Sequence, residues 1–332
     1  MLGSSDRPLC AAYDLAMLDL DGVVYVGGEA VPGAPGHLAA VREAGMRLAF
    51  ITNNAARSPA RVAEHLRELG VSAEESDVVT SAQAAARLLA DRLGGGAEVA
   101  LLGGAGLEEA LLAEGLKPVT VHDEARAIVS GYGPDVVWRD IMQAAVRIRD
   151  GLLWVASNTD RTFPTEYGVA PGHGVLVATL SSFSGVEPLV AGKPQRPLLD
   201  ETVRRVGGER PLMVGDRLDT DIAGAQHAGF DSLLVMTGVT GLPELVAATA
   251  DERPTYVAPD LAGLLEAQPV PDADDGDPVL GGWKAEVRSG RLVVDGDGSP
   301  GDWWRVVASA AWGHLDETGD VVDVSDLRAP LP

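Results

Sequence analysis

The chain has 332 residues, about twice the size of an average domain, so its length predicts two or three compact units. Its 49 acidic and 26 basic residues give a formal net charge of −23, which argues against binding to nucleic acid or to anionic membrane surfaces. Hydrophobic residues make up 46% and charged residues 23%, as is typical of a globular protein that folds in water. No stretch of sequence approaches the ~18 consecutive apolar residues that a membrane span requires.

Cysteine usage predicts a reducing compartment. Cys10 is the only cysteine, so an intramolecular disulfide is impossible and a thiolate zinc site would lack ligands. The pair Leu9-Cys10 resembles the end of a lipoprotein signal, but neither a basic start nor an apolar region of about 7 to 15 residues precedes it. We therefore expect a cytoplasmic protein.

From Asp14 onward the sequence repeats a pattern that is typical of parallel α/β sheets. A short apolar run is followed by polar or glycine-rich residues and then by a helical stretch. Ser58 and Pro59 form a helix start, and Gly70 a helix stop. In chain order we predict strands at 15–20 and 47–51, a helix at 59–69, a strand at 212–214, a helix at about 221–227 and a strand at 233–236.

Residues 82–188 interrupt this sheet with an α/β pattern of their own. The segment is long enough to be a domain, and a domain inserted by two chain crossings is suited to cover an active site. Within it we predict strands at 99–102, 127–129 and 153–156 and helices at 107–114 and 137–149.

The C-terminal part begins with an acidic, proline-rich stretch, residues 269–279, which we predict to be a solvated linker. Residues 280–332 follow as a small α+β unit. Four of the six tryptophans lie in it, and a small core needs such large apolar groups, so we predict that they form this core. The alternative is a binding or regulatory module for a ligand, a partner or a second subunit. The tryptophans are Trp283, Trp303, Trp304 and Trp312, and the predicted elements are a hairpin of strands 283–288 and 291–295, a helix at 303–312 and a strand at 321–324.

The strongest chemical signal is Leu18-Asp19-Leu20-Asp21-Gly22-Val23-Val24-Tyr25, in which an apolar strand ends in two carboxylates. In open α/β sheets, ligands bind outside the carboxyl ends of the strands. Taken alone, Asp19 and Asp21 would be read as two surface aspartates at a strand end. Three further segments favour a binding site instead.

These segments carry groups that suit a phosphate or a divalent cation. Residues 52–54, Thr-Asn-Asn, offer a hydroxyl and backbone N–H groups as donors to phosphate oxygens. Lys193 comes just before Pro194, which we predict to start a helix, so that a cation and a helix N-terminus would act on one anion. Residues 216–221 follow a strand with several carboxylates, which are the ligands that a hard ion such as Mg²⁺ prefers.

Other patterns in the chain are weak. Gly104-Ala105-Gly106 lacks the third glycine of a dinucleotide fingerprint, and the loop from Asp295 has Val306 where a calcium loop needs glutamate. The six histidines show no metal-binding spacing.

The four motifs Asp-Leu-Asp-Gly-x-x-Tyr, Thr-Asn-Asn, Gly-Lys-Pro and Gly-Asp-Arg-Leu-x-Thr-Asp, in this order, resemble class IIA of the haloacid dehalogenase (HAD) superfamily. Residues 157–160 and 171–174 resemble the Asn-x-Asp and Pro-Gly-x-Gly pattern of the type 2 cap of that class. The resemblance covers about residues 14–265. It implies a doubly wound, Rossmann-like α/β core with an inserted α/β type 2 cap, here followed by a small C-terminal α+β appendage. The implied core is residues 1–81 and 189–268, and the implied cap is residues 82–188.

The resemblance implies a role for each matched residue. Asp19 would be the nucleophile that forms an aspartyl phosphate, and Asp21 would protonate the leaving group and then deprotonate water. Mg²⁺ would lie on Asp19, Asp216 and the backbone carbonyl of Asp21. The other implied assignments are Thr52, the Asn53 backbone and Lys193 to phosphoryl oxygens, Asp221 and Asn54 as supporting residues, and Asn158, Asp160 and His173 as cap contacts to the substrate.

The resemblance therefore implies a Mg²⁺-dependent phosphatase that acts on a small phosphomonoester. Members of the class with a C-terminal extension near a Gly-Trp pair, as at Gly282-Trp283, hydrolyse glycerol 3-phosphate and recycle phospholipid head groups, so we predict this substrate. Phosphoglycolate, 4-nitrophenyl phosphate, pyridoxal phosphate and nucleotides remain alternatives, because the cap loops set specificity. Relatives are often dimers through the cap, which implies a homodimer. A binding protein with an inactive enzyme fold is disfavoured, since all four motifs keep their reactive residues.

Overall fold

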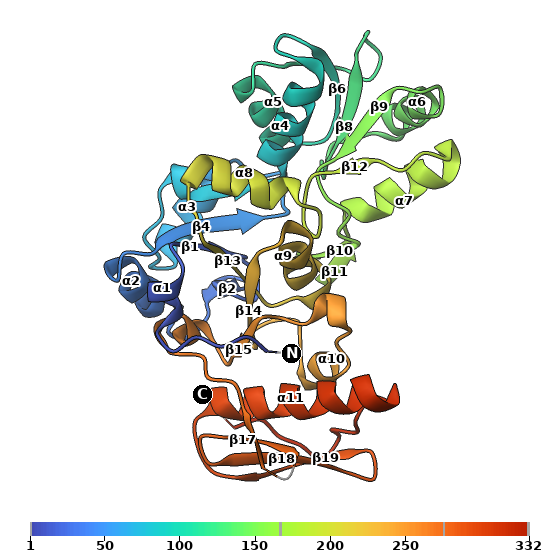
Figure 1. Cartoon of the computed structure of the whole chain (residues 1–332). Coiled ribbons are helices and arrows are strands. Elements are labelled where there is room, and N and C mark those ends of the chain that lie inside the picture. The colour runs from blue at the N-terminus through green and yellow to red at the C-terminus, as the bar shows by residue number, and fades with distance from the viewer. Residues whose placement is uncertain (1, 166–167, 275, 331–332) are drawn as a thin grey trace. The chain divides into compact units, whose positions relative to one another are not determined.

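The computed structural model describes residues 2–165, 168–274 and 276–330, in which the chain forms two compact units (Figure 1). The first unit comprises Met1–Ala49, Leu69–Ser72 and Gly208–Pro332, and the second comprises Phe50–Glu68 and Ala73–Gly207. Both units contain parallel β-sheet and helices, which confirms the predicted α/β class.

The first unit is built around a parallel sheet, and an antiparallel sheet follows it in the sequence. Its elements up to the parallel sheet's last strand are α1 (Leu9–Ala12), β1 (Leu15–Leu18), β2 (Tyr25–Val26), β3 (Glu29–Ala30), α2 (Ala34–Glu43), the start of β4 (Arg47–Thr52), β13 (Pro211–Gly215), the π-helical η2 (Leu218–Ile222), α9 (Ala223–Ala228), β14 (Asp231–Val235), α10 (Leu242–Val246), η3 (Ala250–Glu252) and β15 (Tyr256–Ala258). The remaining elements are η4 (Leu261–Leu265), β16 (Asp272–Asp274), β17 (Asp277–Leu280), β18 (Trp283–Arg288), β19 (Arg291–Gly296) and α11 (Pro300–Thr318).

The parallel sheet of the first unit has the order β15-β14-β13-β1, and β4 follows next to β1. β1 pairs with β13 along its whole length, and all four of its residues are buried. Strands that are buried on both faces have continuous apolar sequences, which is why the sequence pattern predicted them. β1 ends at Leu18, earlier than predicted, because the Leu20 carbonyl accepts hydrogen bonds from the N–H groups of residues 23–25 and the chain turns there.

A second, antiparallel sheet has the order β16-β17-β18-β19, and α11 packs along it (Figure 1). The predicted hairpin is confirmed, with its turn at Ser289-Gly290. Residues 269–279, predicted to be a solvated linker, instead include β16 and the start of β17, because their backbones pair while the β16 side chains face solvent. The predicted strand at 321–324 is wrong: Asp323 makes only an isolated bridge to Arg291.

The C-terminal tryptophans lie in a hydrophobic core that they share with the parallel sheet. Trp303, Trp304 and Trp312 on α11 are 3%, 7% and 2% exposed, and their cluster includes Leu234 of β14 and Leu245 of α10. The predicted core role is therefore confirmed for these three tryptophans. The core is larger than predicted, because it joins the C-terminal elements to the rest of the first unit.

The second unit contains a five-stranded parallel sheet with helices on both faces. Its elements are the end of β4, α3 (Pro59–Glu68), η1 (Glu75–Asp77), β5 (Val78–Thr80), α4 (Ser81–Leu93), β6 (Glu98–Leu102), α5 (Ala105–Ala113), β7 (Lys117–Val119), β8 (Ala127–Ser130), α6 (Trp138–Arg149), β9 (Leu153–Ala156), β10 (Thr162–Thr165), β11 (Gly168–Pro171), α7 (His173–Ser184), β12 (Leu189–Val190) and α8 (Pro197–Val206).

The sheet of the second unit has the order β12-β9-β8-β6-β7, with α4 and α5 on one face and α6 and α7 on the other (Figure 1). The core on the α6 and α7 side includes the fully buried Trp154 of β9. The strands and helices that the sequence predicts between residues 99 and 156 all occur, with ends that agree to within two residues. β5 pairs in parallel with β4, and α3 confirms the helix predicted from Pro59.

Membrane-spanning helices are not found in residues 2–165, 168–274 and 276–330, where each helix is too short or too polar to cross a bilayer.

The buried side chain of Arg305 connects α11 to the segment that follows η4. Arg305 is 4% exposed and donates two hydrogen bonds to Oε1 of Gln268, at 2.6 and 3.1 Å, and one to Asp302 at 2.9 Å. Gln268 is itself 1% exposed, and its backbone pairs with that of Ser5 near the N-terminus. Burial lowers the pKa of Arg305, and Asp302 opposes this effect. The Arg305 side chain thus joins α11 to Gln268, whose backbone in turn pairs with Ser5 near the N-terminus.

Replacement of this arginine is expected to destabilise the fold. Arg305→Ala leaves the buried Gln268 oxygen without its donors and opens a cavity, so we expect the free energy of unfolding to fall by about 3 kcal/mol. Urea denaturation measures this change. The control is Arg291→Ala, whose side chain is 52% exposed and pairs with Asp323 and Asp326; here we expect a change below about 1 kcal/mol. Equal effects of the two substitutions would contradict the role assigned to Arg305.

Candidate active site

Three carboxylates gather at the carboxyl edge of the parallel sheet in the first unit. β1 and β13 are neighbours, the Asp19 N–H donates to the Val214 carbonyl at 2.9 Å, and Asp216 directly follows β13. One oxygen of Asp19, one of Asp216 and one of Asp221 lie within 4.8 Å of one another. Asp216 and Asp221 are 1% and 0% exposed. Carboxylate oxygens so close together fit a hard divalent cation such as Mg²⁺, which would offset their mutual repulsion.

Asp221 is held by the backbone at the start of its own loop. Its Oδ2 accepts hydrogen bonds from the N–H groups of Asp216 at 3.2 Å and Arg217 at 3.1 Å. The predicted helix from 221 is wrong at its start, because the π-helical turn η2 already begins at Leu218 and α9 continues it. This turn directs the Asp221 carboxylate back toward Asp216, so a residue with a predicted supporting role lies within the acidic cluster.

The segment between β14 and α10 holds Asp216, and sequence reasoning missed it. The Val239 N–H donates to Oδ2 of Asp216 at 2.6 Å, and the Thr240 N–H donates to its carbonyl at 3.1 Å. Thr237 donates through its hydroxyl to the Gly22 carbonyl at 2.6 Å. One sequence feature could have identified this segment: it directly follows the predicted strand at 233–236, just as the recognised motifs directly follow strands.

Two glycines leave room for the Asp216 carboxylate. A Cβ atom at Gly22 would lie 2.3 Å from Oδ2 of Asp216, and one at Gly238 would lie 2.0 Å from the same atom. Gly22 also has φ of +82°, which L side chains rarely adopt. Any side chain at either position would therefore displace the Asp216 carboxylate, so both positions require glycine.

Asp21 lies in the turn after β1, where the Gly22 N–H donates to the Tyr25 carbonyl at 2.8 Å. The Asp21 side chain is exposed, whereas Asp19 is half-buried. An exposed carboxyl group is accessible to a substrate and to water, as an acid and base must be.

In the second unit, Asn53 is the centre of a hydrogen-bonded cluster. Its Oδ1 accepts from the Lys193 N–H at 2.8 Å, and its Nδ2 donates to the Lys193 carbonyl and to Oδ1 of Asp160, both at 3.1 Å. Its carbonyl oxygen accepts from the Ser81 hydroxyl at 2.5 Å and from Nδ2 of Asn158 at 2.7 Å. The structure thus brings together four predicted site residues from three distant segments. Sequence reasoning missed Ser81, which carries no motif.

Lys193 and Thr52 are buried beside this centre, at 2% and 7% exposure. The Thr52 hydroxyl accepts from the Asn54 N–H at 3.1 Å. The prediction that Pro194 starts a helix is wrong. The Gly192 carbonyl accepts from the Gln195 N–H at 3.0 Å and closes a turn first, so α8 begins only at Pro197.

The predicted cap contacts differ in their surroundings. Asp160 is half-buried and bonds to Asn53, whereas His173 is 4% exposed and its Nδ1 is 2.9 Å from the Asn158 carbonyl. Burial lowers the pKa of His173 to about 4, and the hydrogen bond to Asn158 opposes this effect. The ring is therefore neutral at pH 7, with the Nδ1 proton donated to the carbonyl. A Cβ at Gly174 would lie 2.1 Å from the Thr159 carbonyl, so α7 and this loop pack closely.

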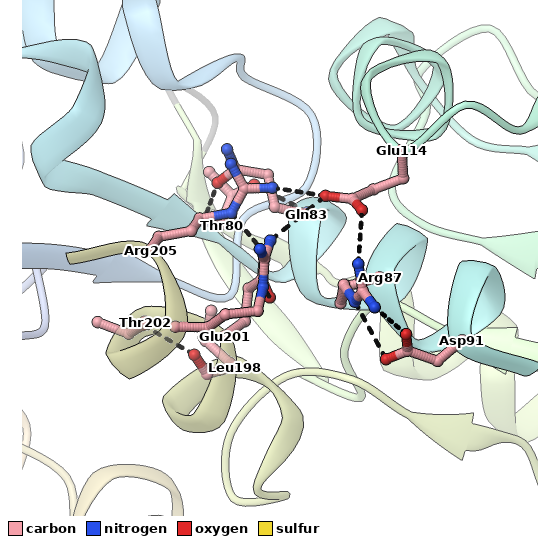
Figure 2. Close-up of polar contacts among 10 residues, drawn as sticks. Thr80, Gln83, Arg87, Asp91, Glu114, Leu198, Glu201, Thr202 and Arg205 are labelled. Carbon is pink, nitrogen blue, oxygen red and sulfur yellow. Dashed lines mark hydrogen bonds and ion pairs between the residues drawn. The ribbon is translucent and has the colours of Figure 1, made fainter. Parts of the chain in front are cut away.

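Ion pairs connect the helices on which this cluster is built (Figure 2). The Glu201 side chain is 2% exposed and accepts two hydrogen bonds from Arg204 at 2.7 Å and another from Arg205. Glu114 accepts from Arg205 at 2.9 Å and from Arg87 at 3.3 Å. The network joins α8, the end of α5 and α4. Since α8 follows the lysine loop and α4 begins with the serine that bonds to Asn53, these pairs fix both segments.

A cavity of about 440 Å³ in the second unit is lined by none of the predicted site residues, although Thr159 and Gly174 of the two cap motifs contribute to its wall. Its lining residues are Thr159, Arg161, Gly174, Val177, Ala178, Ser181, Ser182 and Glu187.

Two family models match the chain. The model of haloacid dehalogenase-like hydrolases matches residues 16–117, and a HAD-hydrolase-like model matches residues 190–264. The chain is 42% identical to the D-glycerol 3-phosphate phosphatase of Mycobacterium tuberculosis over 92% of this chain and 88% of that protein. It is 34% identical to an acid sugar phosphatase of Staphylococcus saprophyticus over 76% of this chain and 97% of that protein.

Solved structures give the same result. A glycerol phosphate phosphatase of Mycobacterium tuberculosis in complex with magnesium matches with a TM-score of 0.84 and 42% identity over 92% of each chain. Its complex with calcium also matches with a TM-score of 0.84, at 40% identity over 97% of this chain and 94% of that one. A 4-nitrophenylphosphatase of Thermotoga maritima matches with a TM-score of 0.72 and 30% identity over 77% of this chain and 98% of that one.

The chain therefore belongs to the haloacid dehalogenase-like hydrolases. Within that family it is a phosphatase, a phosphoric monoester hydrolase, with the HAD fold that its motifs predicted.

Gly238→Ala is expected to reduce phosphatase activity about 10- to 100-fold, because the new Cβ displaces the Asp216 carboxylate. Phosphate release from 4-nitrophenyl phosphate measures the loss. The control is Gly36→Ala within α2, where a Cβ meets nothing within 4 Å and we expect activity to be unchanged. A Gly238→Ala enzyme with wild-type activity would contradict the packing described here.

His173 is expected to make folding stability depend on pH. Because its pKa is lower in the folded chain than its ordinary 6.5, the unfolded chain binds the proton more readily, and stability falls as the pH drops from about 6.5 towards about 4. The loss attributable to His173 is about 3 kcal/mol over this range. Urea denaturation at a series of pH values compares wild type with His173→Gln, which should show a shallower decline. Parallel curves would rule out the buried neutral histidine.

Proposed function

We propose that this phosphatase hydrolyses D-glycerol 3-phosphate in a Mg²⁺-dependent reaction through an aspartyl-phosphate intermediate. The observation that carries the proposal is the cluster of three carboxylates at the ends of β1 and β13. The magnesium complex of the mycobacterial relative supports the choice of metal. Two of the three carboxylates are buried, and such a cluster is a suitable ligand set for a hard cation.

The chemistry proceeds in two displacements. Asp19 attacks phosphorus, the bond between phosphorus and the alcohol oxygen breaks, and Asp21 donates a proton to that oxygen as the alcohol leaves. Asp21 then takes a proton from water as the water attacks phosphorus. The bond to the Asp19 carboxylate breaks, which releases inorganic phosphate and regenerates Asp19.

Asp19, Asp216 and the backbone carbonyl of Asp21 would hold the cation, and Asp221 completes the acidic cluster. When bound, Mg²⁺ offsets the charge of the carboxylates and of the transferred phosphoryl group. The loop of residues 237–241 keeps Asp216 in position through its two N–H donors.

Lys193, Thr52 and the Asn53 backbone bind the phosphoryl oxygens in this proposal. A lysine and a hydroxyl placed in advance stabilise charge that develops on these oxygens in the transition state. Asn54 supports Thr52, since its N–H bonds to the Thr52 hydroxyl.

Substrate choice is assigned to the cap, residues 82–188, and the reaction itself to the core, residues 1–81 and 189–268. Asn158 and Asp160 are the proposed contacts to the alcohol part of the substrate, and His173 acts through the Asn158 carbonyl to which it bonds. A substrate enclosed by a cap is small, so phosphoproteins are not expected.

Glycerol 3-phosphate is favoured over the other candidate substrates because the match to the glycerol 3-phosphate phosphatase includes a larger share of this chain. The match to the mycobacterial enzyme includes 92% of this chain, whereas the match to the acid sugar phosphatase includes 76%.

We also propose that the reaction takes place in the cytoplasm and serves to recycle phospholipid head groups. The enzyme is a homodimer in this proposal. Nucleic acid and membranes are not partners in this proposal, because the net charge of −23 opposes both. Phosphoglycolate, pyridoxal phosphate, nucleotides and 4-nitrophenyl phosphate are the competing substrates.

The test is phosphate release from glycerol 3-phosphate and from each competing substrate, with Mg²⁺ or with a chelator. We expect the highest kcat/KM for glycerol 3-phosphate, and no release in the chelator. Asp19→Asn removes the nucleophile and is expected to lower kcat by about 10⁴-fold or more. Lys284→Ala is the control and should retain wild-type rates, because this lysine is half-buried, pairs with Asp274 and lies far in sequence from the four motifs.

A higher kcat/KM for another substrate would overturn the choice of glycerol 3-phosphate and keep the mechanism. Full activity of Asp19→Asn, or of wild type in the chelator, would overturn the mechanism itself.

A further inference from the structure

A path of hydrogen bonds runs from the C-terminal helix to the acidic cluster within the first unit. Trp312 of α11 is 2% exposed, and its Nε1 donates to the Leu245 carbonyl of α10 at 2.8 Å. The Leu245 N–H in turn donates to the Gly241 carbonyl at 3.0 Å. Gly241 follows Thr240, whose N–H donates to the carbonyl of Asp216.

The loop of residues 237–241 is attached to β14 at its start and to α10 at its end, and both attachments affect its position. Its near end follows β14, and the Thr237 hydroxyl bonds to the Gly22 carbonyl. Val239 then donates to Oδ2 of Asp216 at 2.6 Å, although its side chain is 66% exposed. Because the Val239 side chain makes little packing contact, the backbone of the loop determines the position of this residue. The loop continues into α10, so the position of α10 influences the direction of the Val239 N–H.

α10 has five residues, too few for a helix to be stable by itself. Its final carbonyl groups also need donors from outside the helix. α11 provides such a donor at Trp312. Arg253, which follows η3, adds a second hydrogen bond just after α10, since its Nε donates to the Ala248 carbonyl at 3.0 Å. The Arg253 guanidinium bonds to Asp316 at 2.7 and 2.8 Å and lies 5.3 Å from the centre of the Trp312 ring.

We propose that Trp312 is a positioning residue for the metal site: through α10 it holds the loop that orients Asp216, and so sets the affinity of the cluster for a divalent cation. The inference rests on the proposed function, and it gives the C-terminal helix a role in the reaction. Trp312 is suited to this role because its ring fills the shared core while its N–H reaches the backbone of α10.

The test is Mg²⁺ binding by isothermal titration calorimetry with the full chain. Trp312→Phe keeps an aromatic ring and removes the N–H donor. We expect the Kd for Mg²⁺ to rise on the order of 10-fold, as is typical for loss of an outer partner of a metal ligand. The Mg²⁺ concentration for half-maximal activity should rise in parallel, with kcat at saturating Mg²⁺ nearly unchanged.

Two further variants separate positioning from general loss of packing. Trp304→Phe changes the same residue type on the same helix, at a ring packed edge-on against Trp303, and should leave the Kd at the wild-type value. Asp316→Asn alters a side chain that is 56% exposed and weakens its pairing with Arg253, so a smaller rise in Kd is expected from a chain that still folds.

An unchanged Kd in both Trp312→Phe and Asp316→Asn would overturn the inference and leave the proposed function standing. An equal rise in Trp304→Phe would also overturn it, because the effect would then come from the core as a whole. Absence of Mg²⁺ binding by wild type would overturn the metal-dependent mechanism and this inference together.

Discussion

The crowding of three carboxylates within 4.8 Å is the constraint on which the first unit depends. Like charges at this separation repel one another, and burial of two of them adds a desolvation penalty. The chain offsets this by placing backbone N–H donors on the carboxylates, from Val239 to Asp216 and from residues 216–217 to Asp221. The remaining repulsion favours a bound cation, which is why a metal-dependent reaction suits this arrangement.

In the second unit, distant segments are joined by a neutral side chain, that of Asn53. An asparagine amide donates and accepts at once, so Asn53 binds both backbone groups of Lys193 and still reaches Asp160. Segments that are more than 100 residues apart in the sequence are therefore fixed by one residue. Ion pairs between α4, the end of α5 and α8, in which Glu201 is buried and the arginines are partly exposed, connect the helices that adjoin these segments (Figure 2).

The C-terminal elements are part of the structure that carries the acidic cluster. Their tryptophans share a core with Leu234 and Leu245, and buried polar contacts from Arg305 and Trp312 connect α11 to segments elsewhere in the unit. A large apolar residue with a polar end can serve both purposes, which accounts for the concentration of tryptophan in this short stretch. Two parts of the acidic segment before it, Asp272–Asp274 and Asp277–Leu280, form β-strands, because backbone pairing does not require apolar side chains.

The sequence by itself determined the α/β class, most of the strands and helices, and the motifs that hold Asp19, Asp216 and Lys193. These are local properties: strands buried on both faces are apolar throughout, and reactive residues directly follow them. Tertiary structure alone decided that Val239 and Gly238 enclose Asp216, that Ser81 bonds to Asn53, and that the C-terminal tryptophans join the main core. Contacts of this kind join residues that are distant in the sequence, and many are made by backbone groups that every residue possesses, so no residue pattern marks them before the chain is folded.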